Sequence, residues 1–414
     1  MTALSGSPFE PLRHPAYRRL WFGTLCLNLG LWMQVVTAAW LMVSLQGTPL
    51  QVGLIQTASA LPAFLFALPG GVIADLVERR RYLLRAQSAS AVVALLTGAL
   101  AAADSIGAAL LLGLTFGFGL AYAVQGPAWF TAQLDVLPQG SHLAAVSLGT
   151  VSYSSARAIG PALAGALMVW SSPALVFFVV GGLALVSVLL LHGVSAIPRQ
   201  QAPDQARESF RAAFAGALHF ARTSQPLQAQ LLRTVAFVLP AAALWALLPL
   251  LLAGDSSGGA GHYGLLLGSL GVGAVAGALL LPWAAAHSSR RRIDTIGVAA
   301  FLGATLAAAL IADALALLVL LFFVGGIGWS WVSNLGVANL QTQAAPHLRA
   351  RALGLYLLAF QGSLALGGAL WGQFAKSAGV REALFVAAAG LVAAGWLSRR
   401  LPWPSAPKNP PLPR

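Results

Sequence analysis

Long apolar runs separated by short polar breaks dominate the pattern of this chain. A membrane-spanning helix needs about 20 mostly apolar residues, and twelve stretches of the sequence meet that requirement. The pattern therefore predicts an all-α membrane protein with twelve transmembrane helices. The stretches lie at 19–45, 50–75, 82–103, 106–134, 143–169, 172–193, 228–252, 262–286, 293–312, 314–341, 350–374 and 379–399.

One long polar segment, 194–226, divides these runs into six and six. Part of it places Phe210, Phe214 and Phe220 largely on one side of a helix, which predicts an amphipathic helix on the membrane surface. Two related six-helix bundles joined by a linker are therefore expected. The expected divisions are an N-terminal bundle (1–193), a cytoplasmic linker (194–226), a C-terminal bundle (227–400) and a cytoplasmic tail (401–414).

Composition supports a chain that faces lipid. Only 8% of the residues are charged and 58% are hydrophobic, whereas soluble domains carry roughly 25% charged residues. The net charge of +13 would suit a nucleic-acid partner on a soluble protein. Here the basic residues lie in breaks between apolar runs, with no basic stripe, so the charge indicates membrane topology and no nucleic-acid partner is expected.

The positions of the basic residues predict the orientation. With the N-terminus inside, the loops on the outer side carry only Lys376 and Arg381, and nearly all other Lys and Arg residues lie inside. Basic residues collect in cytoplasmic loops. We therefore expect a multi-pass protein of the cell inner membrane with both termini in the cytoplasm. The N-terminal segment lacks a signal-peptide pattern, so the first run should be a retained helix.

The break after the second run carries the most specific local motif. The stretch 70–81 reads Gly-Gly-Val-Ile-Ala-Asp-Leu-Val-Glu-Arg-Arg-Arg and contains Gly71, Asp75, Arg79 and Arg80. This spacing resembles the loop signature of the major facilitator superfamily, in which a glycine, an Ala-Asp pair and paired basic residues form a cytoplasmic gate. The simpler alternative is an ordinary loop that follows the positive-inside rule.

The resemblance implies specific contacts for this gate. Asp75 would cap the eleventh helix from the cytoplasmic side, where a helix N-terminus favours negative charge, and Arg79 would pair with Asp135. These contacts would form in the outward-open state and break when the cytoplasmic side opens. Asp135 is alternatively a solvated loop acid. The motif departs from the family pattern at Leu76 and Glu78, where a basic residue and a glycine are common.

The fifth run carries the other informative residues. Gly160, Pro161 and Gly165 resemble an element found in exporters of the superfamily and largely absent from its importers, and small residues allow close helix packing. Arg157 is the ionisable residue placed well inside a span. Because such an arginine usually faces a cavity or a partner, it is expected to bind an anionic group or to steer protons. Alternatively, it is a structural arginine bonded to backbone carbonyls.

Several amide and aromatic side chains within the runs are further candidates for the central cavity. Buried amides need partners, so some should face water or substrate, although each could instead form an interhelical hydrogen bond. Trp329 and Trp331 could stack on a flat ligand or simply face lipid. The candidates are Asn28, Gln34, Gln56, Tyr122, Gln125, Trp245, Trp329, Asn334 and Gln361.

Three further segments, 125–138, 156–161 and 343–367, resemble the branch of the superfamily that holds enterobactin exporters and macrolide-efflux proteins. The resemblance implies a monomeric secondary active exporter of small amphipathic, siderophore- or drug-like molecules. It would be proton-coupled and work by alternating access. The alternative is an importer or facilitator of a small metabolite on the same fold.

The acidic residues and histidines limit the chemistry. No Asp or Glu lies in the middle of a predicted helix, so coupling would use Asp75, Asp135 or protonation of the substrate. The seven histidines are scattered without metal-ligand spacing, and the chain has no nucleotide-binding loop. The sequence therefore predicts no enzyme activity, no metal and no cofactor. The single cysteine, Cys26, is expected to be a packing residue.

Overall fold

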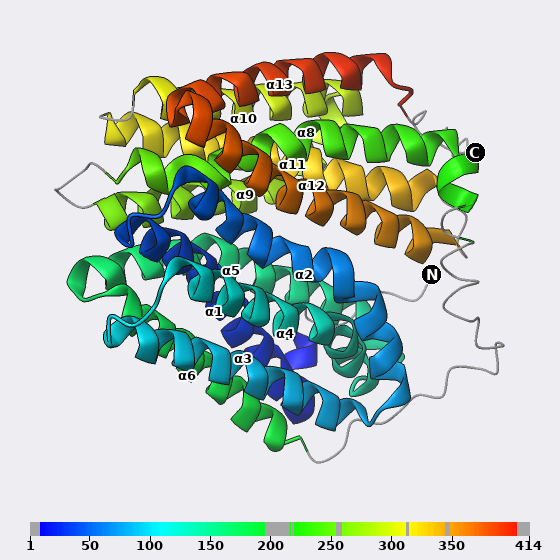
Figure 1. Cartoon of the computed structure of the whole chain (residues 1–414). Helices are drawn as coiled ribbons and strands as arrows, with labels where there is room; N and C mark the ends of the chain where they lie inside the picture. The colour runs from blue at the N-terminus through cyan, green and yellow to red at the C-terminus, as the bar shows by residue number, and fades with distance from the viewer. Residues whose placement is uncertain are drawn as a thin grey trace, which may run out of the picture.

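The computed structural model describes residues 9–194, 216, 219–253, 259–311, 314–343 and 348–403, without the side chains of 67–76, 127, 139 and 350. All regular structure in these residues is helical, and it forms twelve long helices (Figure 1). The first six are α1 (Pro15–Ser44), α2 (Pro49–Leu76), α3 (Arg79–Ala102), α4 (Ala108–Asp135), α5 (His142–Trp170) and α6 (Pro173–His192). The others are α8 (Gln225–Leu251), α9 (Gly259–His287), α10 (Arg290–Leu310), α11 (Leu315–Gln343), α12 (Arg349–Ala378) and α13 (Val380–Arg400).

The helices form two bundles, α1–α6 and α8–α13, which lie side by side with both chain ends at the same end of the molecule (Figure 1). We call this end the terminal end and the opposite one the far end. The predicted all-α fold with two six-helix bundles is confirmed, and the helix boundaries differ from the expected ones by a few residues. The predicted amphipathic linker helix lies mostly outside the described residues, which include Gly216 and the helical segment 219–223 of it.

Eleven of the described helices are long and apolar enough to cross a membrane. Helix α5 is not among them. Yet α5 is 29 residues long, as are α9 and α11. Its hydropathy is low because it carries polar residues such as Thr150, Tyr153 and Arg157, which line the cavities described below. The fifth predicted span is therefore a helix with one polar face turned away from lipid.

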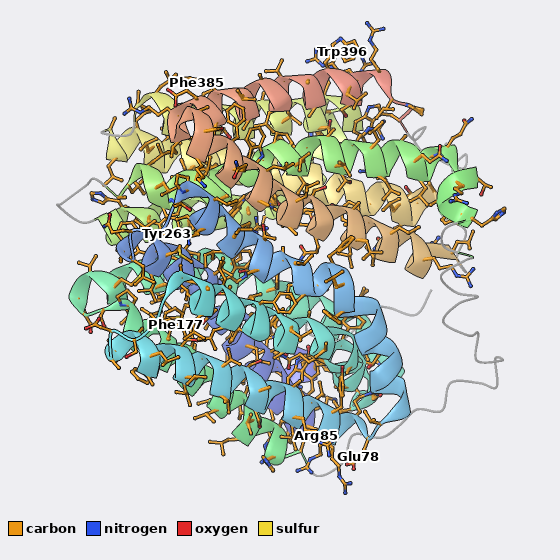
Figure 2. All side chains as sticks on the ribbon, viewed as in Figure 1. Glu78, Arg85, Phe177, Tyr263, Phe385 and Trp396 are labelled. Carbon is orange, nitrogen blue, oxygen red and sulfur yellow. The ribbon has the colours of Figure 1, made fainter. Side chains whose placement is uncertain are left out.

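The outer surface of the bundles is apolar, as a lipid-facing surface should be. Phe385 and Trp396 lie on the outside of α13 and are exposed, whereas Phe177 and Tyr263 are fully enclosed (Figure 2). A continuous cluster of buried apolar side chains runs through both bundles. The core therefore joins the halves rather than filling each one separately.

Glycine seams join the two bundles at the far end. Between α2 and α12, a Cβ added to Gly53 would collide with the carbonyl oxygen of Gly368. Between α5 and α9, a Cβ on Gly165 would lie 2.7 Å from the Cα of Gly264. The hydroxyl of Thr57 also donates to the carbonyl of Ala365 at 2.6 Å. Backbones can approach this closely only where side chains are absent.

Toward the terminal end the bundles stand apart. On α12, Gly362 still packs against Phe64 of α2, but a Cβ on Gly354 would meet no atom within 4 Å. Leu357, on the same helix, is 51% exposed although it lines an internal cavity. The structure is therefore closed at the far end and open toward the chain termini.

Candidate functional site

The guanidinium group of Arg157 lies among three tryptophan rings. Its Cζ atom is 5.3 Å from the ring centroid of Trp32, 5.5 Å from that of Trp245 and 5.2 Å from that of Trp329. All three distances are within the range of cation–π attraction. We call these four side chains the Arg–Trp box. It combines α1 and α5 of the first bundle with α8 and α11 of the second.

The box borders a central cavity of about 270 Å³, lined by residues from both bundles. Six of the sequence-predicted cavity residues line it. Trp32, which sequence reasoning missed, could have been found because it lies one helical turn after Asn28 on the same face of α1. The six are Gln56, Arg157, Trp245, Trp329, Asn334 and Gln361.

The polar atoms at the box are mainly hydrogen-bond donors. Among the described residues, Nε of Arg157, Nε1 of each of its three tryptophans and Oγ of Ser333 are buried without a hydrogen-bond partner. The amides of Gln56, Asn334 and Gln361 also line the cavity and supply acceptor oxygens, and no Asp or Glu is among the described lining residues. A buried cation surrounded by unused donors favours a flat, acceptor-rich anion as its partner.

A second cavity, about 370 Å³ in volume, lies within the first bundle between α1, α4 and α5. Asn28, Tyr122 and Gln125, which were expected in the central cavity, line this adjoining cavity instead. Asn28 lies one turn closer to the terminal end than Trp32, and α4 lines only this second cavity. We call it the N-half pocket.

Hydrogen bonds hold the polar groups of the N-half pocket in place. The hydroxyl of Tyr122 donates to Oδ1 of Asn28 at 2.7 Å, and Nδ2 of Asn28 donates to the hydroxyl of Ser152 at 3.2 Å. Tyr153 lines both cavities. The two cavities are therefore neighbours on one face of α5.

Gln34 lines neither cavity, contrary to expectation. It is only 1% exposed, and both of its amide atoms lack partners in the described part of the chain. Two residues after Trp32, it points to nearly the opposite side of α1, because each residue turns the helix by about 100°. Its position is therefore within the packed helices rather than at the site.

At the terminal end of the first bundle, Arg79 at the start of α3 forms an ion pair with Asp135 at the end of α4. Asp135 is 14% exposed, so it is not a solvated loop acid. Nη2 of Arg80 donates to the carbonyl of His192 at 3.1 Å. Gly71 and Asp75 lie in the last turns of α2, whose side chains are outside the described part, so the expected cap by Asp75 stays a prediction.

The ion pair of Arg79 is present while the terminal ends of the bundles stand apart. The expectation that this pair breaks when that side opens is therefore wrong for this pair. Its two partners are on α3 and α4, which pack together within one bundle. A movement of one bundle against the other leaves their separation unchanged.

The predicted small-residue element of α5 contacts two different helices. A Cβ on Gly160 would lie 2.8 Å from Cβ of Trp32, so this glycine makes room for the Arg–Trp box. Pro161 and Gly165 face Gly264 of α9, since a Cβ on Gly264 would lie 2.6 Å from the Pro161 carbonyl. The element thus shapes the box and the far-end seam together.

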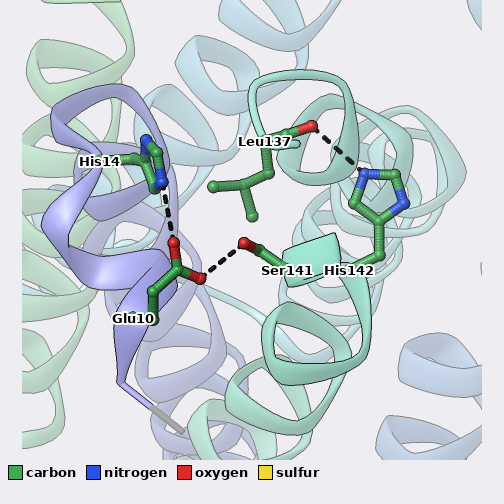
Figure 3. Close-up of polar contacts among 5 residues, drawn as sticks. All are labelled: Glu10, His14, Leu137, Ser141 and His142. Carbon is green, nitrogen blue, oxygen red and sulfur yellow. Dashed lines mark hydrogen bonds and ion pairs between the residues drawn. The ribbon is translucent and has the colours of Figure 1, made fainter. Parts of the chain in front are cut away.

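The start of α5 is tied to the N-terminal segment through a short 3₁₀ helix, η1 (Glu10–Arg13) (Figure 3). The carboxylate of Glu10 accepts from the hydroxyl of Ser141 at 2.5 Å and contacts Nε2 of His14 at 3.2 Å, while His142 contacts the carbonyl of Leu137. The Ser141 hydrogen bond, followed by that of His14, lowers the pKa of Glu10. The ionised carboxylate is therefore the form that holds this contact.

Comparisons with known proteins agree with this architecture. The chain is 28% identical over 395 residues to the enterobactin exporter EntS of Salmonella typhi, covering 93% of this chain and 91% of that protein. EntS of Salmonella typhimurium is likewise 28% identical, over 389 residues. These proteins are transporters rather than enzymes.

Solved structures share the fold at low sequence identity. The nucleoside transporter NupG superposes with a TM-score of 0.76 at 14% identity, covering 93% of this chain and 98% of that chain. A bacterial homologue of the lysosomal transporter Spinster, in an inward-facing conformation, gives 0.75 at 15% identity, covering 97% and 100%.

The family model described as transmembrane secretion effector matches residues 6–410, which is nearly the whole chain. The match includes both bundles and every residue of the two cavities. The resemblance seen in the sequence motifs is thereby confirmed. The chain belongs to the transmembrane secretion effector family of the major facilitator superfamily.

Proposed function

We propose that this protein is a secondary active exporter of small amphipathic molecules that works by alternating access. Its family and its similarity to enterobactin exporters support export, and the basic residues at the terminal end support a cytoplasmic location of both termini in the inner membrane. In this orientation the open side is the one from which an exporter loads. The alternative is an importer or facilitator of a small metabolite on the same fold.

The observation that carries the proposal is the Arg–Trp box, which both bundles build. Arg157 and Trp32 belong to the first bundle, whereas Trp245 and Trp329 belong to the second. A ligand held at the box touches both halves, so rocking of the halves around it changes the side from which it is reached. The far-end seams are the contacts that would separate when the opposite side opens.

The chemistry of the box selects the charge of the substrate. Arg157 is the one charged side chain among the described residues that line the central cavity. A cationic drug would be repelled there, whereas a flat carboxylate or other delocalised anion would stack on the tryptophan rings and pair with the guanidinium of Arg157. The proposed substrate is therefore an amphipathic organic anion of siderophore- or drug-like character.

The proposed coupling ion is the proton. Because the described lining residues of both cavities include no carboxylate, the proton would be carried by Asp75, by Asp135 or by the substrate itself. Asp75 and Gly71 would contribute to closing the cytoplasmic side, while Arg79 and Arg80 brace the first bundle through Asp135 and the carbonyl of His192. Each protein would act as a monomer, since both cavities are complete within one chain.

Transport into everted membrane vesicles tests the proposal. Vesicles with an acidic interior should accumulate 2-naphthoate, a flat anion, and should not accumulate its cationic analogue 2-naphthylmethylammonium. Arg157→Gln should lower the accumulation at least tenfold, because it removes the charge that the substrate binds. Lys376→Gln, a charge removed at the far end of α12, is the matched control and should have no effect.

Two results would contradict this proposal. Accumulation in right-side-out vesicles but not in everted ones would make the protein an importer. Equal transport of the anion by the wild type and by Arg157→Gln would remove the box from the transport path.

A further inference from the structure

We propose that the N-half pocket is a second substrate subsite, in which Gln125 binds an uncharged hydrogen-bonding group of the same molecule whose anionic part lies in the Arg–Trp box. This inference rests on the proposed function. Gln125 is only 3% exposed, and neither Nε2 nor Oε1 of its amide has a hydrogen-bond partner among the described residues. It nevertheless lines the pocket.

Several other polar groups of the pocket are hydrogen-bonded within the protein. The hydroxyl of Tyr122 binds Asn28, and the hydroxyl of Thr24 accepts from Nε1 of Trp129 and from Nε2 of Gln133. The amide of Gln125, in contrast, lines the pocket with both of its polar atoms unpartnered among the described residues. A buried amide with neither bond made is costly, and a ligand group would satisfy it.

The chemistry of the pocket defines the ligand group. The described residues that line it include no charged side chain, so a charged group would lose its hydration without compensation. An amide side chain offers one acceptor oxygen and two donor hydrogens. The matching ligand group is an uncharged donor and acceptor, such as an amide, a urea or a hydroxyl, and the rings of Trp129 and Tyr122 surround its apolar part.

The two cavities are spaced so that one molecule reaches both. Tyr153, which is 43% exposed, lines both of them. It precedes Arg157 by four residues of α5, as Asn28 precedes Trp32 by four residues of α1, and four residues advance a helix by about 6 Å. A substrate with a flat anionic head and a neutral polar group roughly one ring system away therefore fits the combined site.

Binding to the purified full-length protein in detergent micelles, measured by isothermal titration calorimetry, tests the second subsite. The two probes are 2-naphthoate, which has only the anionic head, and 6-acetamido-2-naphthoate, which adds an amide at the other end of the ring system. The wild type should bind the longer probe more tightly, by about fivefold to tenfold. Gln125→Leu should abolish that advantage and leave the affinity for 2-naphthoate unchanged.

Two variants separate this inference from the proposed function. Arg157→Gln should weaken the binding of both probes at least tenfold. Gln34→Leu is the matched control, because Gln34 is also a buried glutamine of the first bundle with both amide atoms unpartnered among the described residues, but it lines neither cavity. Gln34→Leu should leave the affinity of both probes unchanged.

The outcomes are decisive. If the wild type binds both probes equally, or if Gln125→Leu weakens both to the same extent, the second subsite is refuted while the Arg–Trp box stands. If neither probe binds the wild type, or if Arg157→Gln leaves both affinities unchanged, the proposed anion site is refuted, and the second subsite with it.

Discussion

The two bundles place an arginine at the same position but give it different acceptors. In the first bundle, Arg79 begins α3 and pairs with the carboxylate of Asp135 at the end of α4. In the second, Arg290 begins α10, and its Nη1 donates to the amide oxygen of Asn339, near the end of α11, at 3.1 Å. The cation and its helix position are the same in both bundles, whereas the acceptor is charged in the first and neutral in the second.

The second bundle uses its carboxylate elsewhere. Asp294, one turn into α10, is buried and accepts from the hydroxyl of Ser398 on α13 at 2.6 Å. Nδ2 of Asn339 in turn donates a hydrogen bond to Oε1 of Gln230 on α8 at 3.1 Å. At this end of the first bundle, α3 and α4 are held by an ion pair. The corresponding arginine of the second bundle is held by a hydrogen bond to the neutral amide of Asn339, which is itself bonded to the neutral amide of Gln230. Protonation or added salt should therefore weaken the Arg79–Asp135 ion pair more than the Arg290–Asn339 hydrogen bond.

The largest expected effect comes from removing the acceptors one at a time. Asp135→Ala removes the carboxylate that Arg79 binds and should lower the free energy of unfolding by about 3 kcal/mol, because a largely buried guanidinium loses its counter-charge. Asn339→Ala removes a neutral acceptor and should cost about 1 kcal/mol. Unfolding in mixed micelles, followed by circular dichroism, measures both.

Equal losses in these two variants would contradict the claimed difference between the bundles. Asp135→Asn provides the sharper control. It should bring the first bundle close to the second in stability, because the variant keeps an oxygen acceptor at nearly the same position.

A smaller effect is expected when the second bundle is given the charge of the first. Asn339→Asp should change the free energy of unfolding by no more than about 1 kcal/mol, since the gain in attraction to Arg290 is offset by desolvation and by the lost bond to Gln230. The new dependence on salt is the diagnostic result. The variant should lose stability between low and high ionic strength more than the wild type does, and an unchanged salt dependence would show that no ion pair forms.

The smallest effect concerns the two chain ends. The first bundle holds its N-terminal segment through the carboxylate of Glu10, while the second holds its C-terminal segment through Arg233, which donates to the Pro402 carbonyl at 2.6 Å and stacks on Trp403. The pKa of Glu10 is lowered in the fold from 4.5. Its contact therefore stabilises the fold above that value and is lost as the pH falls through the lowered pKa.

Hydrogen exchange at residues 139–145, compared between the wild type and Glu10→Ala, should show the difference. The variant should exchange faster near neutral pH, and the two proteins should converge once the pH falls below the lowered pKa of Glu10. Residues 398–403, where neither the carbonyl of Pro402 nor the ring of Trp403 titrates, should exchange alike in both proteins. A difference that persists undiminished at low pH would contradict the role of the ionised Glu10 carboxylate.

The sequence predicted the fold well because the bilayer imposes it. Apolar runs long enough to span lipid must become helices, so the twelve elements and their order followed from hydropathy and from the basic loops. Even α5, which falls below the hydropathy of the other spans, was predicted as the apolar run 143–169. Arg157 could be predicted as a site residue because an ionisable side chain in the middle of a span is costly unless it faces a cavity or a partner.

The partition of the site could not be predicted from the sequence. Asn28 and Gln125 looked equivalent to Gln56 as mid-span amides, yet only the packing of α4 against α1 shows that they line another cavity. Gln34 points between helices because of a rotation around α1 that hydropathy does not specify. Trp32 was missed although it lies one turn after Asn28, and its role depends on two tryptophans from the other bundle that complete the box.

The lone guanidinium at the centre of the protein has an electrical consequence. In the proposed cycle the carrier that returns without the monoanion keeps the uncompensated guanidinium charge, in addition to any proton that it brings back, whereas the monoanion neutralises that charge in the loaded carrier. Moving one elementary charge across the bilayer is worth about 2.3 kcal/mol per 100 mV. The transmembrane voltage would therefore act on the return of the unloaded carrier rather than on the step that delivers the cargo, and the turnover rate, more than the apparent affinity, would follow the membrane potential.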